Sequence, residues 1–135
     1  MQQELLKWKS KGNYFSFKGY QIFYIKEGSG PVLTIFHGYP YNSFDFEKIW
    51  DELIQKFTVI VPDMLGMGFS DKPENHDYSF DETADLYTAL LEELQITESH
   101  ILTHDLGNSV VQELLARNEE GKNIFAIKSI AFLNG

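Results

Sequence analysis

Short apolar runs alternate along this chain with segments whose apolar residues recur at helical spacing, and this alternation constrains the fold most strongly. The runs are short enough to be buried strands and lie at Val32–Phe36, Phe57–Val61, His100–Thr103 and Lys128–Leu133. The helical segments between them lie near Phe46–Ile54, Ser79–Leu94 and Asn108–Asn118. Such alternation produces a parallel sheet with helices on both faces.

The residues before Val32 indicate an antiparallel hairpin. Tyr14–Phe17 and Tyr20–Ile25 alternate apolar and polar residues on either side of Lys18-Gly19. We therefore expect an α/β fold with six strands, in which the sheet is mostly parallel after the opening hairpin. The polar stretch Ser70–Asp77 is expected to be a loop inside this fold, not a domain boundary.

Two of the helices have recognisable starts. Asn42 or Ser43 is the expected N-cap of the first helix, because both side chains accept hydrogen bonds from backbone N–H groups. Ser79 is followed three residues later by Glu82, which is the spacing of a capping box.

Composition excludes several classes of function. The chain has 135 residues, 43% of them hydrophobic and 15% aromatic, which is enough apolar material for a packed core. Its formal net charge is −9 and no run of Lys or Arg exceeds two residues, so we expect neither a nucleic-acid partner nor an anionic membrane partner. There is no cysteine, and the apolar runs are far shorter than the roughly 20 residues of a membrane span. With no signal-peptide pattern at its start, the chain is expected to be cytoplasmic.

The segment with the clearest chemical signature is Thr103–Gly107, at the carboxyl end of a predicted strand, where α/β sheets place their chemistry. A sharp strand-to-helix turn with small residues around the nucleophile is a nucleophile elbow. Gly107 provides the small residue on one side of Asp105, whereas Thr103 replaces the usual glycine on the other side.

An aspartate at this corner has mechanistic content. A serine hydroxyl needs a base before it attacks, whereas a carboxylate is ionised at neutral pH. Attack by Asp105 on a saturated carbon would form an alkyl ester, as in opening an epoxide or displacing a halide. Water must then hydrolyse that ester with the help of a general base, normally His.

These motifs also have other interpretations. Asp105 taken alone is more often an N-cap of the following helix. Ser109 is a poor alternative nucleophile, because it is followed by valines and lies within the predicted helix. The spacing Gly66-x-Gly68 lacks the third glycine of a dinucleotide-binding loop, which favours a tight structural loop.

The segment His37-Gly38-Tyr39-Pro40 follows the strand Val32–Phe36, one strand before the Asp63–Ser70 loop. In this order, the backbone N–H groups of Tyr39 and Leu106 are expected to converge near Asp105 as an oxyanion hole. The four histidines have no metal-ligand spacing, and His104 is expected to be structural.

Together these motifs resemble the α/β-hydrolase superfamily, in its branch of epoxide hydrolases and haloalkane dehalogenases, and most closely the mesoderm-specific transcript-like hydrolases. The resemblance rests on HGYP, VPDMLGMGFSDKP, HDLGNSVVQELLAR and IKSIAFLNG, and extends from about Tyr14 to the end. By position it makes Asp105 the catalytic nucleophile and Tyr39 and Leu106 the oxyanion-hole residues. His37, Gly38, His104 and Gly107 are the residues that shape the site.

The resemblance also sets expectations for substrate and extent. It implies an epoxide hydrolase-like enzyme with no cofactor and no metal, acting on a small apolar organic molecule, with a non-catalytic binding module as the alternative. Dehalogenases commonly hold the halide with Asn and Trp side chains, where this chain has Tyr39 and Leu106. Family members run to about twice this length. Residues 1–135 are therefore expected to be the N-terminal part of the core domain, without the cap and the catalytic His, and inactive alone. Such a chain would expose Lys128–Leu133 as an apolar edge and self-associate.

Overall fold

The structure is a computed structural model that describes residues 2–39, 41–122 and 125–133. Its strands are β1 (Asn13–Phe17), β2 (Tyr20–Gly28), β3 (Val32–Phe36), β4 (Thr58–Pro62), β5 (Glu98–His104) and β6 (Ala126–Leu133). Its helices are α1 (Gln2–Ser10), the 3₁₀ helix η1 (Ser43–Phe46), α2 (Glu47–Ile54), α3 (Phe80–Glu93) and α4 (Leu106–Glu119).

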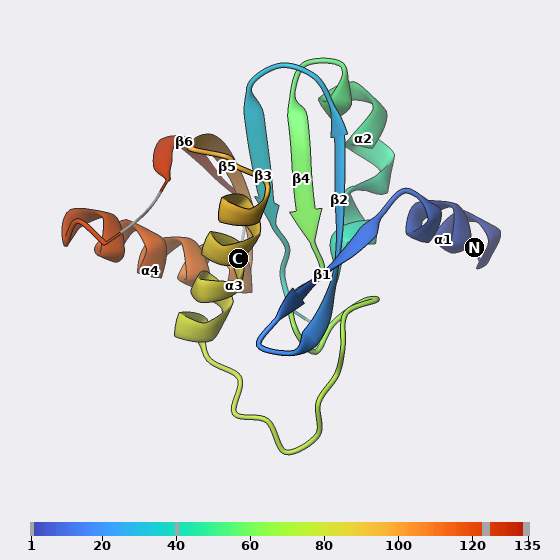
Figure 1. Cartoon of the computed structure of the whole chain (residues 1–135). Coiled ribbons are helices and arrows are strands. Elements are labelled where there is room, and N and C mark those ends of the chain that lie inside the picture. Colours follow the sequence, from blue (N-terminus) through green and yellow to red (C-terminus); the bar gives the residue numbers. More distant parts are fainter. Residues whose placement is uncertain (1, 40, 123–124, 134–135) are drawn as a thin grey trace.

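The strands form one sheet in the order β1-β2-β4-β3-β5-β6 (Figure 1). β3 pairs in parallel with both β4 and β5, and β5 pairs in parallel with β6. The predicted hairpin is confirmed, because β1 and β2 are antiparallel and pair Phe17 with Tyr20. Lys18 and Gly19 between them both have positive φ, as a two-residue type I′ turn requires.

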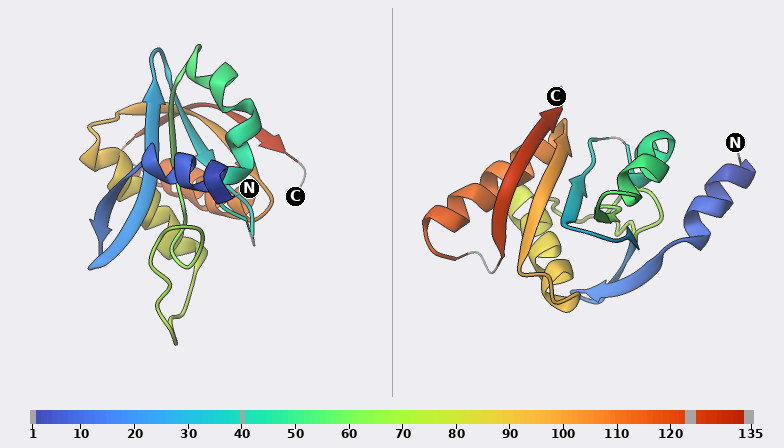
Figure 2. Two further views of the ribbon diagram at one scale, coloured as in Figure 1. Left: turned by 90° about the vertical axis from the view of Figure 1, so that its right-hand side faces the viewer. Right: turned by 90° about the horizontal axis from the view of Figure 1, so that it is seen from above.

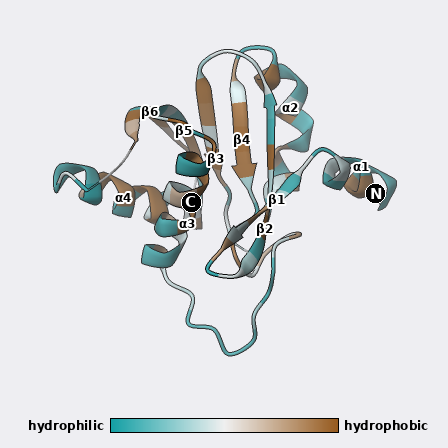
Figure 3. Ribbon diagram, in the orientation of Figure 1, coloured by the Kyte–Doolittle hydropathy of each residue, from teal (hydrophilic) through white to brown (hydrophobic). Residues whose placement is uncertain are grey.

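Helices cover both faces of the sheet, as predicted (Figure 2). On one face, α3 and α4 pack a core that includes Leu90 and Leu114 against Phe36 of β3. On the other face, α1 and α2 contribute Trp8 and Trp50 to a second core. Hydrophobic residues are concentrated in the central strands β3 and β4, while the outer surfaces of the helices are largely hydrophilic (Figure 3). β3 and β4 are apolar on both sides because helices bury both of their faces.

The predicted helix starts are confirmed in part. The Asn42 side chain accepts a hydrogen bond from the Phe44 N–H, so this residue caps η1 and not α2 directly. The Ser79 hydroxyl accepts from the Glu82 N–H at 3.0 Å and caps α3. The Glu82 carboxylate, which the capping box would turn back to Ser79, is hydrogen-bonded to His76 at 2.6 Å.

Helix α1 was not predicted. Most of its residues are polar or exposed, and it is held by Trp8, whose side chain is 1% exposed. The Trp8 indole N–H donates to the Ser43 hydroxyl at 2.9 Å, and its ring meets Trp50 edge to face.

Among the described residues, no helix has the length and apolar character needed to cross a bilayer.

The last strand confirms the predicted apolar edge. β6 is bonded to β5 on one side and ends the sheet on the other. Phe132 and Leu133, near its end, are 51% and 42% exposed. Large apolar side chains on an unpaired strand are a template for pairing with another chain.

Candidate active site

Asp105 occupies a strained corner between β5 and α4. Its backbone has φ 56° and ψ −120°, a conformation that residues other than glycine rarely adopt. Such a conformation costs roughly 1–3 kcal/mol and is found mainly where function requires it. The geometry is the sharp strand-to-helix turn that the sequence predicted at Thr103–Gly107.

Two glycines make this corner possible. A Cβ at Gly107 would lie 2.6 Å from the Phe36 carbonyl oxygen and 2.8 Å from the Thr103 hydroxyl. A Cβ at Gly38 would lie 2.7 Å from the Asp105 Cβ. Because Gly107 has no side chain, there is room for the Thr103 side chain at the position where the elbow pattern has a glycine.

The Asp105 carboxylate is directed toward the turn after β3. Its Oδ2 accepts a hydrogen bond from the Tyr39 backbone N–H at 3.2 Å. Within the described part of the chain, the Asp105 side chain makes no capping hydrogen bond to α4. Asp105 therefore holds the N-cap position of α4 through its backbone, while its side chain does not serve as the cap.

The second expected oxyanion donor, Leu106, is the first residue of α4. The first N–H groups of a helix have no acceptor within the helix and carry its positive dipole end. Both residues are neighbours of the Asp105 carboxylate. Leu106 follows Asp105 in the chain, and the Tyr39 N–H donates a hydrogen bond to that carboxylate.

His37 joins two loops beneath this turn. The Met64 backbone N–H donates to its Nε2 at 2.9 Å, so the neutral ring carries its proton on Nδ1. Nδ1 then donates to the Gly38 carbonyl oxygen at 2.9 Å. Burial lowers the pKa of His37, against smaller opposing effects of Gly38 and of the Asp63 and Asp45 charges. His37 is therefore a neutral group that links the Met64 N–H to the Gly38 carbonyl oxygen.

Asp63 was missed by the sequence analysis as an individual residue. Its carboxylate is buried and accepts from the backbone N–H groups of Ser43, at 2.7 Å, and Phe69, at 2.9 Å. A Cβ at Gly68 would lie 2.2 Å from Asp63 Oδ2, which explains the glycine. The Gly66-x-Gly68 segment is thus a tight structural loop, as predicted. An acidic residue placed directly between a buried strand and this glycine-rich turn was the available signal.

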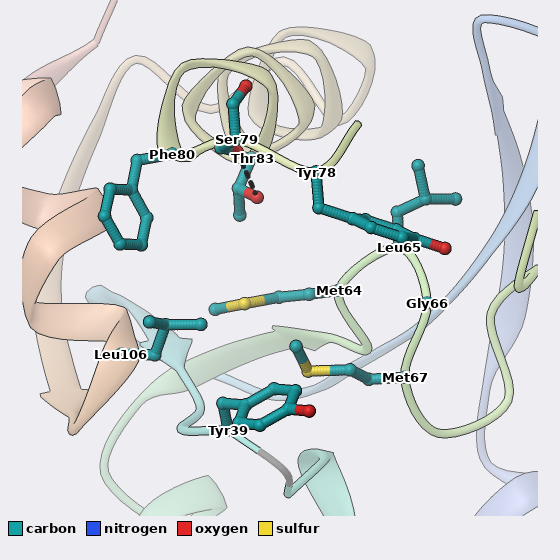
Figure 4. Close-up of a pocket in the computed structure, with 10 residues that line it drawn as sticks. All are labelled: Tyr39, Met64, Leu65, Gly66, Met67, Tyr78, Ser79, Phe80, Thr83 and Leu106. Carbon is teal, nitrogen blue, oxygen red and sulfur yellow. Dashed lines mark hydrogen bonds between the residues drawn. The ribbon is translucent and has the colours of Figure 1, made fainter. Parts of the chain in front are cut away.

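A pocket of about 710 Å³ opens beside the elbow. It is lined by Tyr39, Met64, Leu65, Gly66, Met67, Tyr78, Ser79, Phe80, Thr83 and Leu106 (Figure 4). Asp105 itself is not among the lining residues, but its two neighbours Tyr39 and Leu106 are. No short motif in the sequence marks the methionines or the aromatic residues at the start of α3, because only the topology brings them together.

The remaining histidines have other neighbours. His76 is hydrogen-bonded to Glu82, and His100 to the Ser129 hydroxyl. The His104 ring lies 6.3 Å from the Tyr41 ring, and its Nδ1 would lie 3.1 Å from a Cβ at Gly38. Ser109 lies inside α4, as predicted. Among the residues that the structure describes, no group of His, Cys, Asp and Glu is arranged to hold a metal ion.

Comparison with known proteins defines the class. Residues 31–135 match the family model described as the alpha/beta hydrolase fold, so the chain belongs to the α/β-hydrolase family. It is 42% identical over 139 residues to the mesoderm-specific transcript homolog protein of Bos taurus, covering 97% of this chain and 42% of that protein. It is 33% identical to a cis-3-alkyl-4-alkyloxetan-2-one decarboxylase of Shewanella oneidensis, covering 92% of this chain and 38% of that enzyme.

Solved structures agree with this assignment. The epoxide hydrolase CorEH superposes with a TM-score of 0.79 and 26% identity, over 90% of this chain and 41% of that one. A loop variant of the haloalkane dehalogenase DbeA from Bradyrhizobium elkanii gives a TM-score of 0.78 and 27% identity, over 90% of this chain and 39% of that one. The chain thus spans about two fifths of the length of these relatives, and the resemblance seen in its motifs is confirmed.

Proposed function

We propose that Asp105 is the nucleophile of a hydrolase that forms an alkyl-ester intermediate, most like an epoxide hydrolase. The observation that supports this best is the direction of its carboxylate. At the strained corner, the side chain makes no capping hydrogen bond to α4 and accepts one from the Tyr39 N–H instead. A structural aspartate would satisfy the helix end beside it.

The hydrogen bond distinguishes the two carboxylate oxygens. Tyr39 holds Oδ2, which leaves Oδ1 as the attacking atom. Oδ1 forms a bond to a saturated ring carbon, the carbon–oxygen bond of the ring breaks, and its electron pair goes to the departing oxygen, which takes up a proton from solvent. A halide leaving group is disfavoured, because the Leu106 side chain has no donor to hold it.

Hydrolysis of the ester uses the same hydrogen bond in a second role. Water attacks the carbonyl carbon of the ester, and the negative charge develops on Oδ2, which the Tyr39 N–H holds, with the Leu106 N–H as the proposed second donor. The bond from that carbon to Oδ1 then breaks, Oδ1 leaves with the alkyl group as an alcohol, and the carboxylate is restored with one oxygen from water. A general base must activate the water. His37 does not fit this role, because it is buried and both of its nitrogens are hydrogen-bonded. The proposal therefore places the base outside residues 1–135, which would form the N-terminal part of the catalytic core.

Oxygen labelling in a single turnover tests the proposal. The full-length protein, in excess over a small apolar epoxide, reacts in water enriched in ¹⁸O. An ester intermediate transfers an unlabelled oxygen from Asp105 to the first diol, and Asp105 then acquires ¹⁸O, which peptide mass spectrometry detects. If the label instead enters the diol in the first turnover, water attacks directly and the nucleophile assignment is wrong.

Asp105→Asn provides the matched control, because it keeps the size of the side chain and removes the anionic oxygen. We expect turnover to fall by at least a thousandfold, on the order of the loss when a catalytic nucleophile is removed. Unchanged turnover would favour another catalytic group. A complete lack of turnover of every substrate by the parent protein would favour the non-catalytic binding module.

A second candidate substrate comes from a relative. The Shewanella oneidensis enzyme is named for an oxetan-2-one, which, like an epoxide, has a strained ring with an oxygen on saturated carbon. Attack of Oδ1 on that carbon would open either ring. Parallel assays of both substrates with the full-length protein decide between them.

A further inference from the structure

We propose that Trp8 of α1 is a positioning residue for the reaction, because it fixes the segment that carries the Tyr39 N–H. This inference rests on the proposed function, in which that N–H holds Oδ2 of Asp105. Trp8 acts through Ser43, which follows Tyr39 by four residues in the chain. Helix α1 comes before the part of the chain that matches the family model, which begins at residue 31.

The segment between β3 and η1 is held at both of its ends. Near its start, the Gly38 carbonyl oxygen accepts a hydrogen bond from the Tyr41 N–H at 3.0 Å. At its end, Ser43 is fully buried, and its N–H donates to the Asp63 carboxylate at 2.7 Å. Tyr39 lies between these two attachments, so the direction of its N–H depends on both of them.

Trp8 provides a second hydrogen bond at the Ser43 end. Its indole N–H donates to the Ser43 hydroxyl at 2.9 Å, and its ring meets the Phe44 ring edge to face with the centroids 6.0 Å apart. Within the described residues, no other donor reaches that hydroxyl. Removal of the indole would leave a buried hydroxyl without a donor, which is costly. The end of the segment would therefore shift until the hydroxyl is paired again.

Helix α1 also contacts the second backbone partner of Asp63. The Asp63 carboxylate accepts from the N–H groups of Ser43 and Phe69. Lys9, next to Trp8 in the helix, places its ammonium nitrogen 5.2 Å from the centre of the Phe69 ring. Two successive residues of α1 thus contact the same two loops that Asp63 links beside the site.

The two steps of the proposed reaction depend differently on the Tyr39 N–H. While the ester forms, negative charge leaves the Asp105 carboxylate, so the hydrogen bond to Oδ2 weakens. While water attacks the ester, negative charge develops on Oδ2, and the Tyr39 N–H stabilises it. A displaced N–H therefore slows ester hydrolysis and leaves ester formation nearly unchanged. A loss of stability alone lowers the folded fraction and slows neither step selectively.

Single-turnover kinetics of Trp8→Phe test the inference. The full-length protein is mixed with a small apolar epoxide and quenched at intervals, and intact-protein mass spectrometry follows the ester. Phenylalanine keeps a buried ring and removes the indole donor. We expect ester hydrolysis to slow on the order of tenfold, a part of the roughly 10²–10³-fold loss when a whole oxyanion-hole donor is removed. The ester should then accumulate to a higher level than in the parent.

Trp50→Phe is the matched control. Trp50 is also 1% exposed, and its ring lies against Trp8 with the centroids 4.9 Å apart. Its indole N–H, however, donates to Glu27 of β2 and not to the segment before η1. We expect both steps to keep their parental rates in this variant. Equal slowing of hydrolysis in the two tryptophan variants, or no slowing in either, would overturn the inference.

Ser43→Ala removes the acceptor of the same hydrogen bond. It should slow ester hydrolysis about as much as Trp8→Phe does, and the double variant should be no slower, because both changes act through one contact. Effects that multiply in the double variant would overturn the inference. Unchanged hydrolysis of an ester that does form counts against Trp8 alone, whereas a parent protein that forms no ester contradicts the proposed function and this inference with it.

Discussion

Single residues in this site hold more than one segment at once. The Asp63 carboxylate bonds to the start of η1 through Ser43 and to the following loop through Phe69. The His37 ring joins the Met64 N–H to the Gly38 carbonyl oxygen. Buried polar groups of this kind are expensive to leave unpaired, so each fixes the position of the backbone that it touches.

His37 predicts a pH dependence of stability. Burial lowers its pKa in the folded protein, whereas in the unfolded chain the value is about 6.5. The unfolded state therefore binds more protons than the folded state below pH 6.5. The stabilisation of the fold by neutral His37 is complete above that pH and is lost as the pH falls toward the folded pKa. We expect the free energy of unfolding to fall by up to about 1.4 kcal/mol per pH unit between pH 6.5 and the folded pKa.

Thermal unfolding of the full-length protein at pH 7.5 and 5.5 measures this effect. His37→Gln keeps an acceptor for the Met64 N–H and does not titrate, so its melting temperature should depend less on pH than that of the parent. An equal pH dependence in both proteins would show that His37 does not titrate on unfolding as expected.

At the scale of elements, α1 is attached to the rest of the fold mainly by one side chain. Trp8 is buried against Trp50 and donates to Ser43, whose own N–H bonds to Asp63. The first helix is therefore connected through two hydrogen bonds to the loop that lines the candidate pocket.

Substitutions on α1 test this attachment. Trp8→Ala should reduce the free energy of unfolding by about 3–5 kcal/mol, because it leaves a large cavity. Trp8→Phe keeps an aromatic ring but loses the indole hydrogen bond, and should reduce it by at least about 1 kcal/mol. Leu6→Ala, on the same helix but 59% exposed, is the control and should change stability little. Denaturant titration measures all three, and a loss at Leu6 as large as that at Trp8 would contradict this account.

For the whole molecule, the exposed edge at β6 predicts self-association of residues 1–135 expressed alone. Phe132→Lys places a charge on that edge and should shift the chain toward monomer in sedimentation velocity experiments. Ile49→Lys, at a residue 44% exposed on α2, is the matched control and should not. A monodisperse parent chain at micromolar concentration would show that the edge is not a pairing surface.

The fold was predictable because its signals are local. Strand and helix periodicities lie within short windows, and the predicted run Val32–Phe36 coincides with β3. Helix α1 escaped prediction because it depends on Trp8 reaching Ser43, 35 residues away. Tertiary packing outweighs weak local propensity in such a case.

The candidate site divides in the same way. The elbow at Asp105 and the turn at Tyr39 could be inferred from short motifs and their order, and the structure brings the two together. The pocket could not, because Met64, Phe80 and Leu106 come from three separate segments. Nor could the Asp63 hydrogen bonds, which join residues that only the folded chain makes neighbours.

The double attachment of His37 has a practical consequence for redesign. The His37 ring is hydrogen-bonded to the backbone of both residues 37–39 and residues 63–70. Grafting either segment alone from another hydrolase would therefore displace the backbone of the other segment. An engineer who wishes to exchange the pocket wall should transplant both segments as a single cassette, together with the histidine that links them.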